Sequence, residues 1–215
     1  MTLAQLQSRL ARFLGLQNIG DDPAYLTWST DALNDAQIEV AAELQVPRRL
    51  TTIVASSGPF PAPSDIQTWG IIAATDTTNG NPLAIVDPQT RLAKYPSNTI
   101  GTPELIEYYQ VSNTLQLYPA PPAPVNVEIY YARIPTPMVA PTDEPFDGMY
   151  REYHIIVALK AALLVHEADW GDPSRVQWVY QRYEIEKRRF AERVNKERHT
   201  KPLGEGEISG FTGTA

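Results

Sequence analysis

Two runs of alternating apolar and polar residues, each ended by prolines, constrain this fold more than any other feature of the sequence. They lie in LQLYPAPPAPVNVEIYYARIPTPM, residues 115–138. Because successive side chains of a strand point to opposite faces, the apolar residues of both runs should line one side of a sheet. These residues are Leu115, Leu117, Val127, Ile129 and Tyr131. The prolines between the runs fix φ and lack amide donors, so the pattern predicts two strands joined by a stiff connection.

Further short β-type runs, separated by Gly, Pro, Asn and Ser, surround this stretch. The candidate strands are 50–55, 66–75, 104–110, 113–118 and 125–133. The short gap between 105–109 and 114–118 fits a hairpin, so we expect the 115–138 stretch to supply the last two strands of an antiparallel meander. Residues 76–103 show no clear periodicity and are expected to form a long loop.

Helical periodicity frames this β-rich region on both sides. Apolar residues at three- and four-residue steps predict helices over 2–14, 30–45, 148–168 and 173–198, the second of them capped by Ser29 and Thr30. The third is apolar almost all round from Ile155 to Val165, which places it at the centre of the core. That run is far shorter than the roughly 20 residues of a membrane span, so no membrane association is expected.

The predicted fold class is therefore α+β. We expect a helical bundle of about four helices, with a small antiparallel β-meander inserted at 47–145 and an extended C-terminal arm. One domain should cover 1–201, and the arm should cover 202–215.

The arm cannot fold by itself. Ordering each of its residues costs about 1 to 2 kcal/mol of backbone entropy. Its large apolar residues, Leu203, Ile208 and Phe211, return only about 1.5 to 3 kcal/mol each when buried. Two interpretations remain open, a disordered terminus or a segment that becomes ordered on a partner.

Charge is unevenly distributed along the chain. The formal net charge is −7, yet 173–201 holds half of the 18 Lys and Arg residues. Four cations, Arg182, Arg189, Arg193 and Lys196, lie mainly off the apolar side of the last predicted helix. They are either solvated cations near a helix C-terminus or a contact for an acidic protein partner or DNA. The aromatic residues Tyr180, Tyr183 and Phe190 keep helical spacing, which favours core packing over base stacking.

Patterns typical of enzymes are incomplete. There is no cysteine, and the sequence His166-Glu167-Ala168-Asp169-Trp170 has Trp where a zinc-protease helix carries its second His. Gly204 and Gly206 neither follow a strand nor open a helix, so they form no phosphate-binding loop. The cluster of Asp143, Glu144 and Asp147 precedes a predicted helix, where acidic residues favour the helix dipole. No catalytic residue, cofactor or metal site is predicted, and the protein is not expected to be an enzyme.

The order of these parts resembles the head-to-tail adaptor (head-completion) proteins of tailed bacteriophages. The resemblance extends over almost the whole chain. Its most recognisable residues are Leu115-Gln116-Leu117-Tyr118-Pro119 and Val127-Glu128-Ile129-Tyr130-Tyr131-Ala132-Arg133-Ile134-Pro135. They are accompanied by two N-terminal helices, a Pro-rich acidic link into Tyr150, two C-terminal helices and a loose tail.

The resemblance implies a structural protein of the virion neck, assembled in the host bacterial cytoplasm. Its subunits would form a ring, a dodecamer, beneath the portal protein, with packaged DNA passing along the axis without sequence-specific binding. A tail or stopper protein would bind below. The C-terminal segments would grip the portal through Leu203, Ile208 and Phe211.

Two alternatives stay open. The chain could form a tail-completion or stopper ring one level lower, which would bind tail protein and not the portal. It could instead be a small nucleic-acid-binding protein that uses Arg182, Arg189, Arg193 and Lys196, with binding that falls steeply as salt rises.

Overall fold

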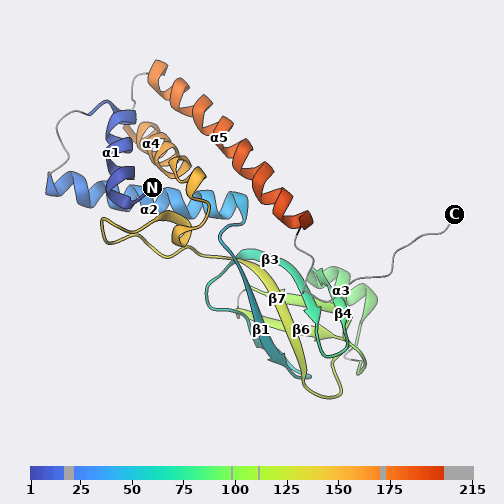
Figure 1. Cartoon of the computed structure of the whole chain (residues 1–215). Helices are drawn as coiled ribbons and strands as arrows, with labels where there is room; N and C mark the ends of the chain where they lie inside the picture. The colour runs from blue at the N-terminus through green and yellow to red at the C-terminus, as the bar shows by residue number, and fades with distance from the viewer. Residues whose placement is uncertain (17–21, 98, 111, 170–172, 201–215) are drawn as a thin grey trace.

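The computed structural model describes residues 1–16, 22–97, 99–110, 112–169 and 173–200. They form a helical part and a β part, placed end to end along the molecule (Figure 1). The helical part contains α1 (Leu3–Leu14), α2 (Pro23–Leu44), α4 (Ile155–Asp169) and α5 (Pro173–Thr200). The β part contains β1 (Arg48–Ala55), β2 (Phe60–Pro61), β3 (Ile66–Asp76), β4 (Asn81–Val86), α3 (Pro88–Lys94), β5 (Leu105–Tyr109), β6 (Thr114–Tyr118) and β7 (Val125–Arg133).

Helix α4 is the centre of the helical core. It contacts α1, α2 and α5, and its residues from Ile156 to Leu163 are buried apart from the half-buried Lys160. A helix that is apolar on all sides has to be covered on all sides, which is why three helices pack on this one. Aromatic rings complete the core, with Phe190 of α5 stacked on Tyr153 at a centroid distance of 4.8 Å.

The start of α2 differs from the prediction. The helix begins at Pro23, because the Asp22 carboxylate accepts a hydrogen bond from the Ala24 amide and proline suits the first helical position. Ser29 and Thr30, the predicted caps, lie inside the helix and donate their hydroxyl hydrogens to the Leu26 carbonyl. A Ser or Thr within a helix can bond to a carbonyl of the preceding turn, so a cap-type residue does not by itself mark a helix start.

The third predicted helix also starts later than expected, at Ile155. Two short 3₁₀ turns, Pro145–Gly148 and Arg151–Tyr153, precede it. The backbone is left-handed at Phe146 and Asp147 within the first turn, and at Tyr150 between the two turns. This irregular segment inserts the fully buried Phe146 ring into the helical core.

The predicted fold class is wrong in its β part. The described strands form one mixed, strongly curved and nearly barrel-shaped sheet, not a small antiparallel meander inserted in a bundle. The strand order is β1-β7-β3-β4-β5-β6-β2, and β4 pairs with β5 in parallel. The sheet encloses its own core, which is separate from the helical core and includes Ile106, Leu115, Val127 and Ile129.

The two alternating runs of 115–138 are not neighbours in this sheet. Strand β6 pairs with β5 and β2, whereas β7 lies between β1 and β3. The predicted hairpin of β5 and β6 is present, with Leu105 opposite Tyr118. Alternation defines which side chains face the core but carries no information on the partner strand, and the proline connection here crosses the sheet.

Residues 76–103, predicted as a loop, contain β4 and α3. The Asp87 carboxylate caps α3 by accepting hydrogen bonds from the amides of Gln89 and Thr90. The helix is held on the sheet by Arg91, whose Nε lies 3.1 Å from an oxygen of the fully buried Glu107 carboxylate. Both elements are short, so neither produces a periodic signal in the sequence.

A single carboxylate joins three helices. Glu43 of α2 accepts hydrogen bonds from Lys187 at 2.5 Å and from the Tyr183 hydroxyl at 3.1 Å, both on α5, and lies 3.6 Å from Lys160 of α4. Burial by itself raises the pKa of Glu43, but the hydrogen bond and charge of Lys187, together with Tyr183 and Lys160, outweigh it and lower the pKa below the ordinary 4.5.

Glu43→Gln should therefore destabilise the protein at neutral pH, by up to about 1 kcal/mol because the group is half exposed. A lowered pKa in the folded state means that the carboxylate stabilises the fold above its unfolded pKa and loses this effect as pH falls through the folded value. The difference between wild type and variant should thus shrink below pH 4.5. Urea unfolding at pH 7 and pH 3.5 measures this difference in the free energy of unfolding. Asp35→Asn on the same helix is the control. A difference between wild type and Glu43→Gln that stays constant with pH would contradict the lowered pKa of Glu43.

Candidate functional site

The predicted basic side of the last helix is exposed in the structure. Helix α5 packs on α4 through Val179, Tyr183, Phe190 and Val194, which are buried. The four predicted cations, Arg182, Arg189, Arg193 and Lys196, are all exposed. Their contact with an acidic protein partner or DNA stays a prediction.

One buried carboxylate orients two of these cations. Nε of Arg182 and Nη1 of Arg189 each lie 3.3 Å from Oε1 of Glu186, which is one helical turn from both. Glu186 is only 7% exposed, whereas both arginines extend into solvent. The three side chains keep a net positive charge, and the two guanidinium groups are held on the surface of the helix.

The exposed side of α5 also carries large apolar residues, which the sequence analysis missed. Trp178 and Ile185 are half exposed, and they alternate with Arg182 and Arg189 at steps of three and four residues. We call Trp178, Arg182, Ile185 and Arg189 the α5 stripe. Of the three aromatic residues predicted to pack in the core, Tyr183 and Phe190 are buried, but Tyr180 is 55% exposed.

The start of α5 is fixed to the end of α1. Arg175 Nη1 donates a hydrogen bond to the Leu14 carbonyl at 2.9 Å, and the rings of Phe13 and Trp178 lie 5.9 Å apart. The guanidinium lies where a side chain at Gly15 would be, since a Cβ there would come within 1.5 Å of it. Gly15 has a φ of +73°, which glycine adopts readily, and so it both ends α1 and admits Arg175.

The other end of α5 is fixed to the β part. Arg48, the first residue of β1, is only 7% exposed and donates hydrogen bonds to the carbonyls of Gln45 and Val194. A buried arginine on backbone carbonyls of two elements fixes their relative position. No local pattern of residues indicates this contact, because it joins residues that are far apart in the chain.

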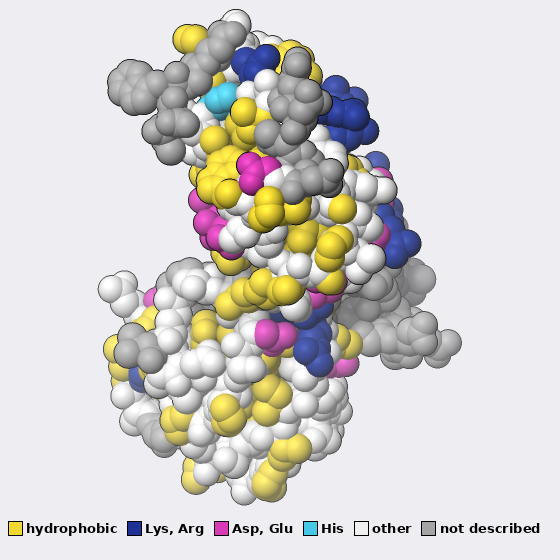
Figure 2. Space-filling model, turned by 90° about the vertical axis from the view of Figure 1, so that its left-hand side faces the viewer, with side chains coloured by type: hydrophobic (Ala, Val, Ile, Leu, Met, Phe, Trp, Pro, Cys, Tyr) yellow, Lys and Arg dark blue, Asp and Glu magenta, His cyan; other side chains and the backbone are white. Residues whose placement is uncertain are grey.

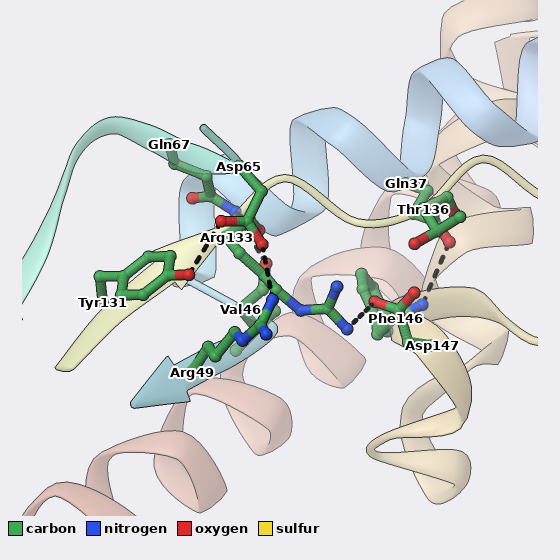
Figure 3. A network of polar contacts seen from close by, with 10 residues as sticks. All are labelled: Gln37, Val46, Arg49, Asp65, Gln67, Tyr131, Arg133, Thr136, Phe146 and Asp147. Atoms are coloured by element: carbon green, nitrogen blue, oxygen red, sulfur yellow. Dashed lines mark hydrogen bonds and ion pairs between the residues drawn. The ribbon is translucent and has the colours of Figure 1, made fainter. Parts of the chain in front are cut away.

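The junction between the two parts is built around side-chain amides (Figure 3). Gln67 of β3 donates hydrogen bonds to the carbonyl of Val46 at 2.9 Å and to that of Arg133 at 2.7 Å. Gln37 of α2 donates to the Thr136 carbonyl and accepts from the Phe146 amide. These two side-chain amides form hydrogen bonds with backbone groups in the two segments that connect the helical part to the β part.

Charged groups surround these amides (Figure 3). Arg133 forms an ion pair of 2.7 Å with Asp147, and Asp65 lies 3.4 Å from Arg49. Asp65 also accepts the Tyr131 hydroxyl hydrogen at 2.8 Å. Burial, and then this hydrogen bond, raise the pKa of Tyr131 to about 12, so the phenol keeps its proton. The helical part is thus held against the sheet at a set angle.

The acidic cluster after β7 has structural partners. The Asp143 carboxylate accepts hydrogen bonds from the amides of Val139 and Ala140, which lower its pKa. Glu144 pairs with Arg151 at 2.8 Å. Within the described part of the chain, no group of His, Asp and Glu residues is arranged to hold a metal ion.

The portal contacts predicted at Leu203, Ile208 and Phe211 lie outside the described residues. Among the helices that are described, none is long and apolar enough to cross a membrane.

Comparison with known protein families gives a match to this chain. The family model described as SU10 adaptor protein matches residues 1–205, which is nearly the whole chain and includes both the helical and the β part. No curated protein matches the sequence.

Gln67→Ala should weaken the junction, because it leaves two backbone carbonyls without their buried donor. We expect a loss of about 2 kcal/mol in the free energy of unfolding. Thr68→Ala, at the exposed neighbouring position, is the matched control and should change it by no more than about 0.5 kcal/mol. Chemical denaturation measures the free energy of unfolding of both variants. If Gln67→Ala is as stable as Thr68→Ala, the Gln67 amide does not hold the junction.

Proposed function

Because this chain belongs to the SU10 adaptor protein family, a phage head-to-tail adaptor family, we propose that it forms a ring beneath the portal and connects the capsid to the tail. The ring would line the channel through which DNA leaves the capsid. The family match over residues 1–205 is the observation that carries this proposal.

The architecture supports a ring subunit. A ring holds each copy at one radius and one tilt, so a subunit with two loosely joined parts would leave the channel wall undefined. Here Arg48, Gln67 and Arg133 bind the two parts together over a buried junction. The β part can therefore form a wall or docking surface at a position fixed by the helical part.

We assign portal binding to the C-terminal arm, residues 202–215. Helix α5 runs from the far end of the helical part toward the sheet (Figure 1), and the Arg48 contact with Val194 places its last turns beside β1. Each arm gains little from burying Leu203, Ile208 and Phe211, but many copies tethered in one ring bind together, which multiplies a weak contact.

The charge of the chain is consistent with a channel. At a net charge of −7 it does not attract phosphates in general, and DNA could pass without being held. The neck of the virion, after assembly in the bacterial cytoplasm, is the proposed location, with a tail or stopper protein bound below.

The nucleic-acid-binding alternative has one observation in its favour. Tyr180 and Trp178 are exposed near Arg182, and aromatic and basic side chains together can bind single strands. Its signature would be DNA binding that weakens steeply with salt. Against it, Glu186 offsets part of the charge of Arg182 and Arg189.

Electron microscopy of the portal protein of the same phage, alone and with this chain, tests the adaptor role. An added axial layer with the symmetry of the portal supports it. Bare portals at high protein excess would favour the lower stopper ring or the DNA-binding alternative.

Deleting residues 202–215 should abolish portal binding and leave the fold intact, since both cores lie within the described residues. Co-sedimentation with portal measures binding, and thermal unfolding checks the fold. The variant with Leu203, Ile208 and Phe211 all changed to Ala should lose binding as well, whereas changing Thr212 and Thr214 to Ala serves as the control. Full portal binding by the truncated chain would refute portal binding through the arm, but it would not refute the adaptor role.

A further inference from the structure

The outward side of α2 carries a stripe that matches the α5 stripe. Trp28 and Ile38 are 42% and 47% exposed, and the exposed Asp31 and Asp35 lie between them at steps of three and four residues. We call these four residues the α2 stripe. Across the described residues, neither Asp31 nor Asp35 makes a hydrogen bond or an ion pair.

The two stripes point away from each other. On α2, the buried Leu33, Ala36 and Val40 face α4, and the stripe lies on the opposite side of the helix. The contacts between α2 and α5 use other flanks, through Glu43 with Lys187. The acidic stripe therefore cannot reach the basic one within a single chain. Figure 2 shows hydrophobic side chains exposed across the helical part, with acidic side chains beside them.

The chemistry of the stripes is complementary. Each presents one Trp and one Ile together with two charges, and those charges are negative on α2 and positive on α5. Opposite charges favour the correct partner, while exposed Trp and Ile supply apolar area. Two different and complementary surfaces on one chain give a heterologous contact, the type that closes rings.

We propose that the α2 stripe of one copy docks against the α5 stripe of the next copy. The contact repeats around the oligomer and pairs Asp31 and Asp35 with Arg182 and Arg189 of the neighbour. This contact rests on the proposed function, because the assembly that it builds is a ring of copies. The occupant is a second copy of this chain, because the complementary surface is present on the chain itself.

The absence of cysteine allows a direct test. Ile38→Cys places one thiol at the end of the α2 stripe, and Ile185→Cys places one within the α5 stripe. A short bismaleimide is added to each variant alone and to their mixture, with and without portal. We expect covalent dimers in the mixture at a yield about tenfold above either variant alone. The double variant should give a ladder of higher oligomers.

Val54→Cys, exposed on β1 and outside both helices, is the matched control for reach and thiol reactivity. Mixed with Ile185→Cys, it should give no more dimer than either variant alone. Introducing Asp31→Lys and Asp35→Lys into the Ile38→Cys chain should lower the mixed cross-link about tenfold, because like charges then face each other. Glu152→Lys in the same chain, an exposed acidic residue outside the stripe, should leave the yield unchanged.

The outcomes separate this contact from the adaptor role. A portal layer without the mixed cross-link overturns the contact and leaves the adaptor role standing. The mixed cross-link without a portal layer supports the contact and counts against portal binding. Equal cross-linking of each single variant with itself, or no cross-link under any condition, overturns the proposal.

Discussion

The hydrogen bonds of Gln67 are the interaction on which the rest of the structure depends. The chain leaves the helical part near Val46 and returns after Arg133, and the Gln67 amide holds the carbonyls of both residues. Buried backbone groups at such a crossing have to be paired, and strand hydrogen bonds cannot pair them where the chain leaves the sheet. Together with the buried Arg48, which donates to the Gln45 and Val194 carbonyls, this amide joins the helical part to the β part.

Each part nevertheless has its own core. This division explains how an acidic chain can present a basic side on α5. The helical core is covered by amphipathic helices whose outer sides face solvent, and the sheet surrounds a second core. Two of the buried carboxylates are paired with cations, whereas the buried Asp76 accepts hydrogen bonds from the amides of Thr78 and Asn79 and from the Asn79 side chain. Glu107 has Arg91 from α3, and Glu186 has Arg182 and Arg189 from its own helix. The chain can thus be acidic overall and still present a basic side on α5.

Local patterns in the sequence define some elements of this fold and not others. The apolar period identifies α1, α4 and α5, because burial on one helix side or on all sides shows directly in residue order. The partners of β7 depend on contacts between residues far apart in the chain, and for this reason the prediction of an antiparallel meander was wrong. For the candidate site, the period located the cations of α5. It did not show that Trp178 and Ile185 are exposed, because apolar residues on a helix are counted toward the core.

The mixture of apolar and charged residues on the outer helix sides has a physical consequence for assembly. A continuous apolar stripe would associate with any other apolar surface, whereas Trp178 and Ile185 are separated by Arg182 and so form no large patch. Charges of one sign on each stripe repel a second copy of the same stripe and accept only the opposite one. A single such contact is weak, so subunits can remain separate in solution. When a symmetric partner gathers many copies, each copy makes this contact on both sides, and the closed ring has no free stripe left to recruit another subunit.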